Sequence, residues 1–101
     1  MKTLPINLPK AKIQQFCQQY SIQKLSLFGS VLRADFTPIS DVDILVEFYP
    51  DQSPTFFGLS IMQDELSQLL ERVVDLRTPI ELSIYFRDRV LAEAMTIYDG
   101  N

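Results

Sequence analysis

The chain has 101 residues, of which 47% are hydrophobic and 22% charged, and its formal net charge is −4. This length favours a single domain, residues 1–101, with room for one active centre. The acidic balance disfavours binding to nucleic-acid backbones, which depends on a basic surface, so we expect no direct nucleic-acid partner. No apolar run is long enough to span a bilayer and the N-terminus lacks a signal-peptide pattern, so we expect a cytoplasmic protein without a membrane partner.

The cysteine and histidine counts restrict the possible metal chemistry. One cysteine, Cys17, and no histidine occur in the chain. An intramolecular disulfide is therefore excluded, and so is a metal centre built mainly from thiolates or imidazoles. Cys17 falls on an apolar helical stripe, so we expect it in the core. Any bound metal must have oxygen ligands.

The first half of the chain predicts one helix and two strands. Pro9 suits a helix start, and apolar side chains at helical spacing predict a helix over residues 9–20. A short strand is predicted over residues 23–28. Residues 41–48 alternate as in a half-buried strand. One face of that strand carries Val42, Ile44, Val46 and Phe48, and the other carries Asp41, Asp43, Leu45 and Glu47.

The second half predicts a loop, a helix, a strand and a last helix. Residues 49–55 contain two prolines and predict a loop, and an apolar stripe predicts a helix ending near residue 71. Residues 72–77 predict a strand in which Asp75 faces away from Val74 and Leu76. Apolar spacing in the tail predicts a final helix over residues 83–98. This order predicts a small α/β (α+β) domain with three strands, helices on one face and the aspartates on the uncovered face.

Two motifs in the central segment suggest phosphate chemistry. The Gly29-Ser30 turn follows an apolar strand, and its backbone N–H groups and hydroxyl are suited to phosphate oxygens. Asp41 and Asp43 share one face of a strand because side chains two residues apart point the same way. Asp75 on a neighbouring strand is able to join them.

Three carboxylates beside a phosphate cradle fit phosphoryl or nucleotidyl transfer. That chemistry requires the attacking and leaving oxygens in line and the developing charge stabilised. Paired aspartates can bridge two Mg²⁺ ions, which prefer oxygen ligands, and a third carboxylate can accept the proton of the attacking hydroxyl. The alternative is that Asp41 is a turn residue and Asp43 a solvated edge carboxylate. Arg33 and Arg77 fit equally a role in holding phosphate or in surface solubility.

These residues resemble a known family. The segments FGSVLRADF (residues 28–36) and SDVDILVEF (residues 40–48), with Asp75 and the tail from Phe86 to Leu91, resemble the minimal nucleotidyltransferase (MNT) domain of the DNA polymerase beta superfamily. The resemblance implies a mixed sheet of three to four strands with helices on one face. It also implies that Gly29 and Ser30 contact the nucleotide triphosphate, and we predict Arg33 and Ser40 as further residues of this phosphate site. Asp41, Asp43 and Asp75 would bind two Mg²⁺ ions, with Asp75 activating the acceptor hydroxyl.

The short chain most closely resembles MNT antitoxins that act on HEPN ribonuclease toxins. This resemblance implies transfer of AMP from ATP to a tyrosine of a HEPN toxin, in a hetero-oligomer. Two alternatives remain at this stage. One is a non-catalytic antitoxin that neutralises its partner by occlusion, and the other is a nucleotidyltransferase for a small molecule or an RNA end.

Overall fold

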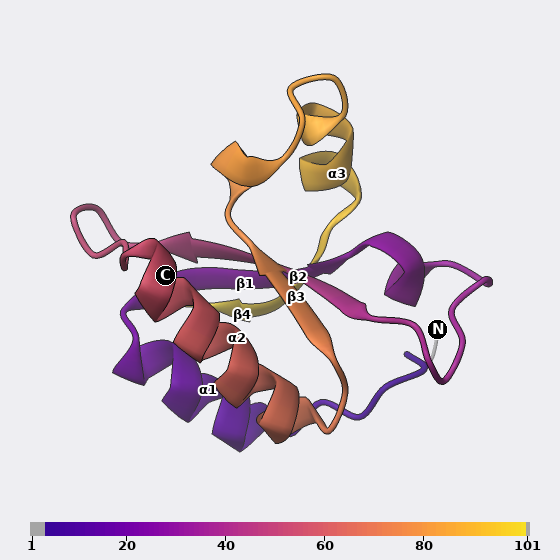
Figure 1. The fold of residues 1–101 in the computed structure, drawn as a ribbon, viewed down its shortest axis with the longest axis horizontal. Coiled ribbons are helices and arrows are strands. Elements are labelled where there is room, and N and C mark those ends of the chain that lie inside the picture. Colours follow the sequence, from indigo (N-terminus) through magenta and orange to yellow (C-terminus); the bar gives the residue numbers. More distant parts are fainter. Residues whose placement is uncertain (1–3, 101) are drawn as a thin grey trace.

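The structure is a computed structural model that describes residues 4–100, and within this range it contains three α-helices and four strands (Figure 1). The helices are α1 (Lys10–Gln19), α2 (Phe56–Leu70) and α3 (Arg87–Glu93), and the strands are β1 (Ile22–Phe28), β2 (Val42–Phe48), β3 (Val74–Arg77) and β4 (Met95–Asp99). Two 3-10 turns, η1 (Gly29–Leu32) and η2 (Pro79–Glu81), follow β1 and β3. None of the helices in residues 4–100 combines the length and apolar character of a membrane span.

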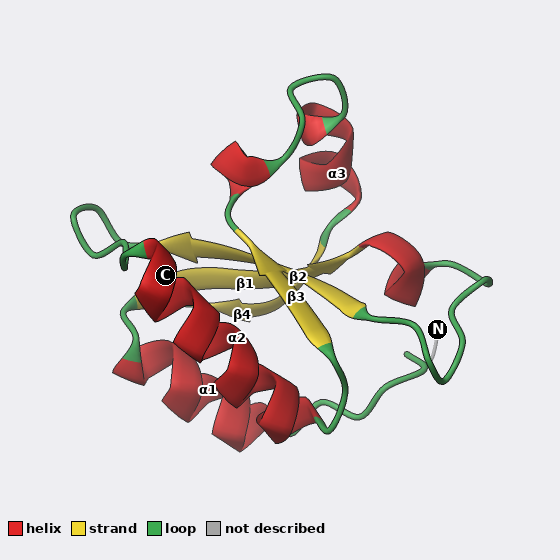
Figure 2. Cartoon of the chain, in the orientation of Figure 1, coloured by secondary structure: helices red, strands yellow, loops and turns green. Residues whose placement is uncertain are grey.

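The four strands form one mixed sheet in the order β3-β2-β1-β4 (Figure 2). β1 runs antiparallel to β2 and to β4, whereas β2 and β3 are parallel. A parallel pair needs a long crossover connection, and α2 provides it between β2 and β3. The small nucleotidyltransferase-type architecture predicted from the sequence is confirmed, with four strands where the order of predicted elements gave three.

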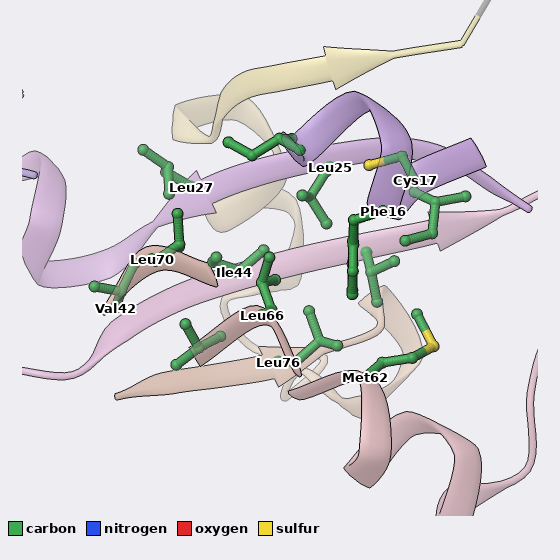
Figure 3. Packing of buried hydrophobic residues seen from close by; sticks show 14 of the residues in the cluster. Phe16, Cys17, Leu25, Leu27, Val42, Ile44, Met62, Leu66, Leu70 and Leu76 are labelled. Carbon is green, nitrogen blue, oxygen red and sulfur yellow. The ribbon is translucent and has the colours of Figure 1, made fainter. Parts of the chain in front are cut away.

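The hydrophobic core lies between the sheet and the two longer helices, α1 and α2. The labelled side chains in Figure 3 come from both helices and from β1, β2 and β3. Cys17 has no exposed surface, so its predicted place in the core is confirmed. The helix ends are defined locally: the Thr55 hydroxyl accepts a hydrogen bond from the Gly58 N–H at the start of α2, and Glu71 adopts a left-handed conformation at its end.

The predicted final helix over residues 83–98 is wrong. Helix α3 covers only Arg87–Glu93, Ala94 is extended with φ −61° and ψ 140°, and Met95–Asp99 forms β4. The free edge of β1 decides the outcome, because pairing with it satisfies the backbone groups of a segment containing the strand-favouring residues Thr96, Ile97 and Tyr98.

The second face of the sheet is only partly uncovered, which also differs from the prediction. The segment containing η2 and α3 lies on the side of the sheet opposite α1 and α2 (Figure 1). Ser26 and Leu45, whose side chains belong to this second face, are both buried. Arg87 holds this segment together by donating hydrogen bonds to the carbonyl oxygens of Ile80 and Leu82 at 3.1 and 2.8 Å. The aspartates therefore lie beside a small cap instead of on a bare sheet.

Candidate active site

The strand register places Phe28, Asp43 and Asp75 in one row across the sheet. Asp43 on β2 lies directly opposite Phe28 on β1 and beside Asp75 on β3. Paired residues on adjacent strands point to the same face, with about 4.8 Å between strands. Val42 and Val74, one position earlier in each strand, are buried in the core, so the row of Phe28, Asp43 and Asp75 faces the opposite side.

Gly29 lies against the carboxylate of Asp43. Its φ of +75° is in the left-handed region, and a Cβ atom placed there would collide with the Asp43 carboxylate oxygen and lie 3.2 Å from Asp43 Cγ. Only glycine satisfies both conditions. The turn that follows is fixed by buried Val31 and by a hydrogen bond of 2.9 Å from the Arg33 N–H to the Ser30 carbonyl oxygen. The Gly29-Ser30 turn and the Asp43 carboxylate are thus packed as one unit.

Partial burial and neighbouring charges together shift the pKa of Asp43. Partial burial raises the pKa of Asp43 above its ordinary value of 3.8, and the negative charges of Asp75 and Asp41 raise this pKa further. The positive charges of Arg77 and Arg33 act in the opposite direction. The structure therefore brings the other two predicted aspartates and both candidate arginines within electrostatic range of Asp43.

Asp75 is already paired with a cation. The Arg77 Nε atom lies 3.3 Å from both carboxylate oxygens of Asp75, and both side chains are partly exposed. Within residues 4–100, the side-chain positions bring no group of three acidic side chains close enough together to hold one metal ion. The donor chemistry nevertheless fits Mg²⁺: the row supplies hard oxygen ligands, and Asp43 carries an incompletely compensated negative charge. Asp41, Asp43 and Asp75 are the residues that would hold such ions, Asp75 in competition with Arg77.

Arg33 and Ser40 have local partners. Arg33 forms an exposed ion pair with Asp35 at 3.3 Å. The Ser40 hydroxyl accepts a hydrogen bond of 3.0 Å from the Thr37 N–H, so it stabilises the turn that precedes Asp41. A direct phosphate contact by Ser40 remains a prediction, and its contact in this structure is within its own loop.

One residue that stabilises the site was missed by sequence reasoning. Arg72 donates hydrogen bonds to the carbonyl oxygens of Thr37 and Ser40 at 3.1 and 2.8 Å, and its guanidinium carbon lies 4.7 Å from the centre of the Phe36 ring. These contacts anchor the loop that leads into Asp41. No local pattern around Arg72 indicates this role, because its partners lie more than thirty positions earlier in the chain.

Two hollows lie at opposite ends of the row. A cavity of about 760 Å³ adjoins Phe28 and Gly29, and the wall facing the turn is formed by α3 and the start of β4. A smaller groove of about 260 Å³ contains Asp75 and Arg77, between the first turns of α2 and η2. The carboxylates and the glycine turn therefore have space for a ligand on both sides.

A glycine turn packed on one of two adjacent carboxylates, with space on either side, fits the requirements of nucleotidyl transfer. The family model described as Nucleotidyltransferase domain matches residues 10–97, and the chain belongs to this family. The chain is accordingly a nucleotidyltransferase.

The relatives agree with this assignment. A protein of Methanocaldococcus jannaschii named "Putative protein adenylyltransferase" is 33% identical over 91% of this chain and 97% of its own length. A solved toxin-antitoxin structure with AMP-PNP superimposes with a TM-score of 0.73 at 21% identity, covering 93% of this chain and 76% of that chain. A tri-AMPylated Shewanella oneidensis HEPN toxin in complex with MNT antitoxin gives a TM-score of 0.64 at 21% identity, covering 89% and 69%. These likenesses confirm the resemblance to MNT proteins and show the shared fold.

Proposed function

We propose that this chain transfers AMP from ATP to a tyrosine hydroxyl of a HEPN ribonuclease toxin, in a Mg²⁺-dependent reaction, and so acts as an antitoxin. The observation that carries the proposal is the row in which Asp43 lies beside Asp75 and against Gly29. The curated relative supports AMP transfer to a protein, since its name describes a protein adenylyltransferase. The HEPN partner is supported by the solved complex with an AMPylated HEPN toxin.

The residues of the row have distinct tasks in this reaction. The backbone N–H groups and hydroxyl of Gly29-Ser30 bind the phosphates of ATP. The tyrosine oxygen forms a bond to the α-phosphorus, and the bond from that phosphorus to the pyrophosphate oxygen breaks. Asp75 accepts the proton of the tyrosine hydroxyl, and pyrophosphate leaves with the electron pair. Mg²⁺ held by Asp41, Asp43 and Asp75 would supply the positive charge that offsets the phosphate charge in the transition state.

A protein acceptor is consistent with the surface around the Asp75 groove. Phe56 lines this groove and its side chain is 84% exposed, and Ile80, next to the groove residue Glu81, is 81% exposed. Phe57 is also exposed on α2. Exposed aromatic and aliphatic side chains around a polar centre are typical of surfaces that contact another protein. This surface would surround the acceptor tyrosine as it reaches Asp75.

The test is the intact mass of the partner HEPN protein after incubation with this chain, ATP and Mg²⁺. We expect the partner to gain one or more AMP groups, and we expect no gain with the Asp41→Ala/Asp43→Ala variant. A control variant with the same type of change outside the row is Asp64→Ala, at an exposed position on α2. If the partner gains no mass and is still neutralised by the double variant, the chain acts by occlusion. Transfer of label to a small molecule or an RNA end without any partner would instead establish that acceptor class.

A further inference from the structure

Strand β3 itself places Arg77 beside Asp75. The two residues are two positions apart on this strand, so their side chains leave the same face of the sheet. The Arg77 Nε atom lies 3.3 Å from each carboxylate oxygen of Asp75. Both oxygens of a carboxylate that the proposed function assigns to Mg²⁺ therefore face a guanidinium group.

The positive charge of Arg77 also acts on the neighbouring strand. Burial raises the pKa of Asp43, and the charges of Asp75 and Asp41 raise it further. Arg77 opposes this upward shift more strongly than Arg33 does. Arg77 thus compensates part of the negative charge at two of the three carboxylates that a metal ion would use.

The contact between Arg77 and Asp75 can be broken at a small cost. Their side chains are 46% and 35% exposed, and an ion pair open to water contributes little to stability. Arg77 also lines the groove of about 260 Å³, which gives its side chain room to move away from the carboxylate. One carboxylate cannot serve a guanidinium and a divalent ion equally well, because the two cations repel each other and use the same oxygen lone pairs.

We propose that Arg77 competes with Mg²⁺ for Asp75, so that this arginine lowers the metal affinity of the row and withholds Asp75 from the site until the metal displaces it. The inference rests on the proposed function, because it takes Asp41, Asp43 and Asp75 as the residues that hold Mg²⁺. Arg77 is then a positioning residue that acts through Asp75. The carboxylate becomes available to the reaction only when divalent metal is present.

The experiment is an NMR titration of the full chain with Mg²⁺ alone, without nucleotide or partner protein. Backbone amide signals of β2 and β3 give the dissociation constant, and the Arg77 Nε–H signal reports the ion pair. We expect Mg²⁺ to shift the Arg77 Nε–H signal with the same dissociation constant as the amides. The Nε–H signal of Arg89 is the internal control, since Arg89 forms an exposed ion pair with Glu93 at the same distance of 3.3 Å, outside the row.

Three variants measure how much Arg77 lowers the affinity. Arg77→Gln should tighten Mg²⁺ binding about fivefold, the scale of a partly exposed ion pair. Arg77→Lys keeps the charge but not the planar fork, so its affinity should lie between those of Arg77→Gln and the unmodified chain. Arg89→Gln removes the cation of the matching pair and should leave the affinity unchanged. The amide spectra show whether each variant is folded.

Arg33→Gln separates direct competition from the effect of a nearby positive charge. Arg33 also lies within electrostatic range of Asp43, but its ion pair is with Asp35. Direct competition therefore predicts a smaller gain in affinity for Arg33→Gln than for Arg77→Gln. An equal gain in the two variants would overturn the inference, and so would unchanged or weaker binding by Arg77→Gln. An Arg77 Nε–H signal that stays fixed while the amides respond to Mg²⁺ would have the same meaning.

The outcomes also distinguish this inference from the proposed function. If the unmodified chain AMPylates its partner and Arg77→Gln does not bind Mg²⁺ more tightly, only the role of Arg77 is wrong. If neither the unmodified chain nor Arg77→Gln binds Mg²⁺, both this inference and the Mg²⁺ dependence of the proposed reaction fail. Tighter binding by Arg77→Gln, together with the shifted Arg77 signal, supports the inference whether or not a partner protein is AMPylated.

Discussion

At the scale of single residues, Asp43 is the residue of the site whose ionised form is disfavoured by its surroundings. It is partly buried, it lies beside Asp75 in the sheet, and it lies close to Asp41. Nearby arginines compensate only in part, because the net effect on the Asp43 pKa is upward. A residue whose charged form is disfavoured by the fold reduces stability whenever it is ionised. Asp43 is therefore expected to reduce the stability of the folded chain.

The first prediction concerns Asp43→Asn in the absence of divalent metal. Below the ordinary value of 3.8 the carboxyl is neutral in both the folded and the unfolded chain, and it has no electrostatic effect on stability. As pH rises through the raised folded-state pKa, the folded chain loses stability relative to the unfolded chain. The Asn variant avoids this loss, so at pH 7 in EDTA its Tm should exceed that of the unmodified chain by a few degrees. The difference should shrink toward low pH.

Metal addition gives the matching half of that experiment. Mg²⁺ should raise the Tm of the unmodified chain more than that of Asp43→Asn, because a ligand that binds only the folded state stabilises it. Asp51→Asn is the control, since Asp51 is exposed in a loop with φ +64° that asparagine also tolerates. A lower Tm for Asp43→Asn at pH 7 without metal would contradict this account of the site.

At the scale of elements, sequence periodicity predicted α1, α2 and the first three strands well, because each has a buried face with regular spacing. The tail was different: Val90, Leu91, Ala94, Ile97 and Tyr98 fit helical spacing, although only the first two lie in α3. Pairing of β4 with β1 depends on residues about seventy positions away, which local spacing does not encode.

The site was also predicted unevenly. Strand alternation predicted that Asp41 and Asp43 share a face and that Asp75 points away from Val74 and Leu76, and the structure adds the parallel register that places Asp75 beside Asp43. The wall of the cavity formed by α3 and the hydrogen bonds of Arg72 to the loop before β2 depend on contacts between segments distant in sequence, so no local sequence pattern predicts them. Local patterns thus predicted the residues of the row, while its surroundings needed the tertiary structure.

The second prediction concerns Arg72 and the loop before β2. Arg72→Ala removes two charge-assisted hydrogen bonds and a contact with the Phe36 ring, at a cost of about 1–3 kcal/mol. Because this loop leads into Asp41, we expect nucleotidyl transfer to fall about tenfold, the equivalent of about 1.4 kcal/mol in the barrier. Hydrogen exchange in residues 37–41 should accelerate in parallel.

Two variants make the Arg72 result specific. Arg72→Lys keeps the charge but loses the planar fork, so it should fall between Arg72→Ala and the unmodified chain. Lys12→Ala removes a positive charge from an exposed position on α1 and should change neither activity nor exchange. Unchanged exchange in the loop of Arg72→Ala would show that Arg72 does not anchor it.

At the scale of the whole molecule, the core between the sheet and helices α1 and α2 (Figure 3) packs on the face of the sheet opposite the row of Phe28, Asp43 and Asp75. Each strand of the row contributes side chains to this core at positions next to the functional ones: Leu27 beside Phe28, Val42 and Ile44 around Asp43, and Val74 and Leu76 around Asp75. Movement of the row relative to the helices would expose these side chains. The geometry of the site is therefore coupled to global stability.

The third prediction uses Cys17 as a reporter of that stability. Burial raises the pKa of the Cys17 thiol to about 12, so the reactive thiolate is scarce at neutral pH and the sulfur is inaccessible. A thiol reagent should label Cys17 only in unfolded molecules, at a rate that rises with the unfolded population. Leu66→Ala leaves a cavity in the core and should lower the free energy of unfolding by about 2–5 kcal/mol, so labelling should become much faster. Rapid labelling of the unmodified chain under native conditions would contradict the burial of Cys17.

The position of the acidic row has an evolutionary consequence. Its carboxylates project from strands that are held together by backbone hydrogen bonds and by core residues on the opposite face. Mutation of the acids would remove the proposed chemistry without removing any of that support, and at Asp43 it would relieve unfavourable charge. A descendant that lost its aspartates would thus keep its shape and its exposed apolar surface. Selection for stability alone would therefore favour such inactive descendants, and only selection for the reaction would oppose the loss of the acids.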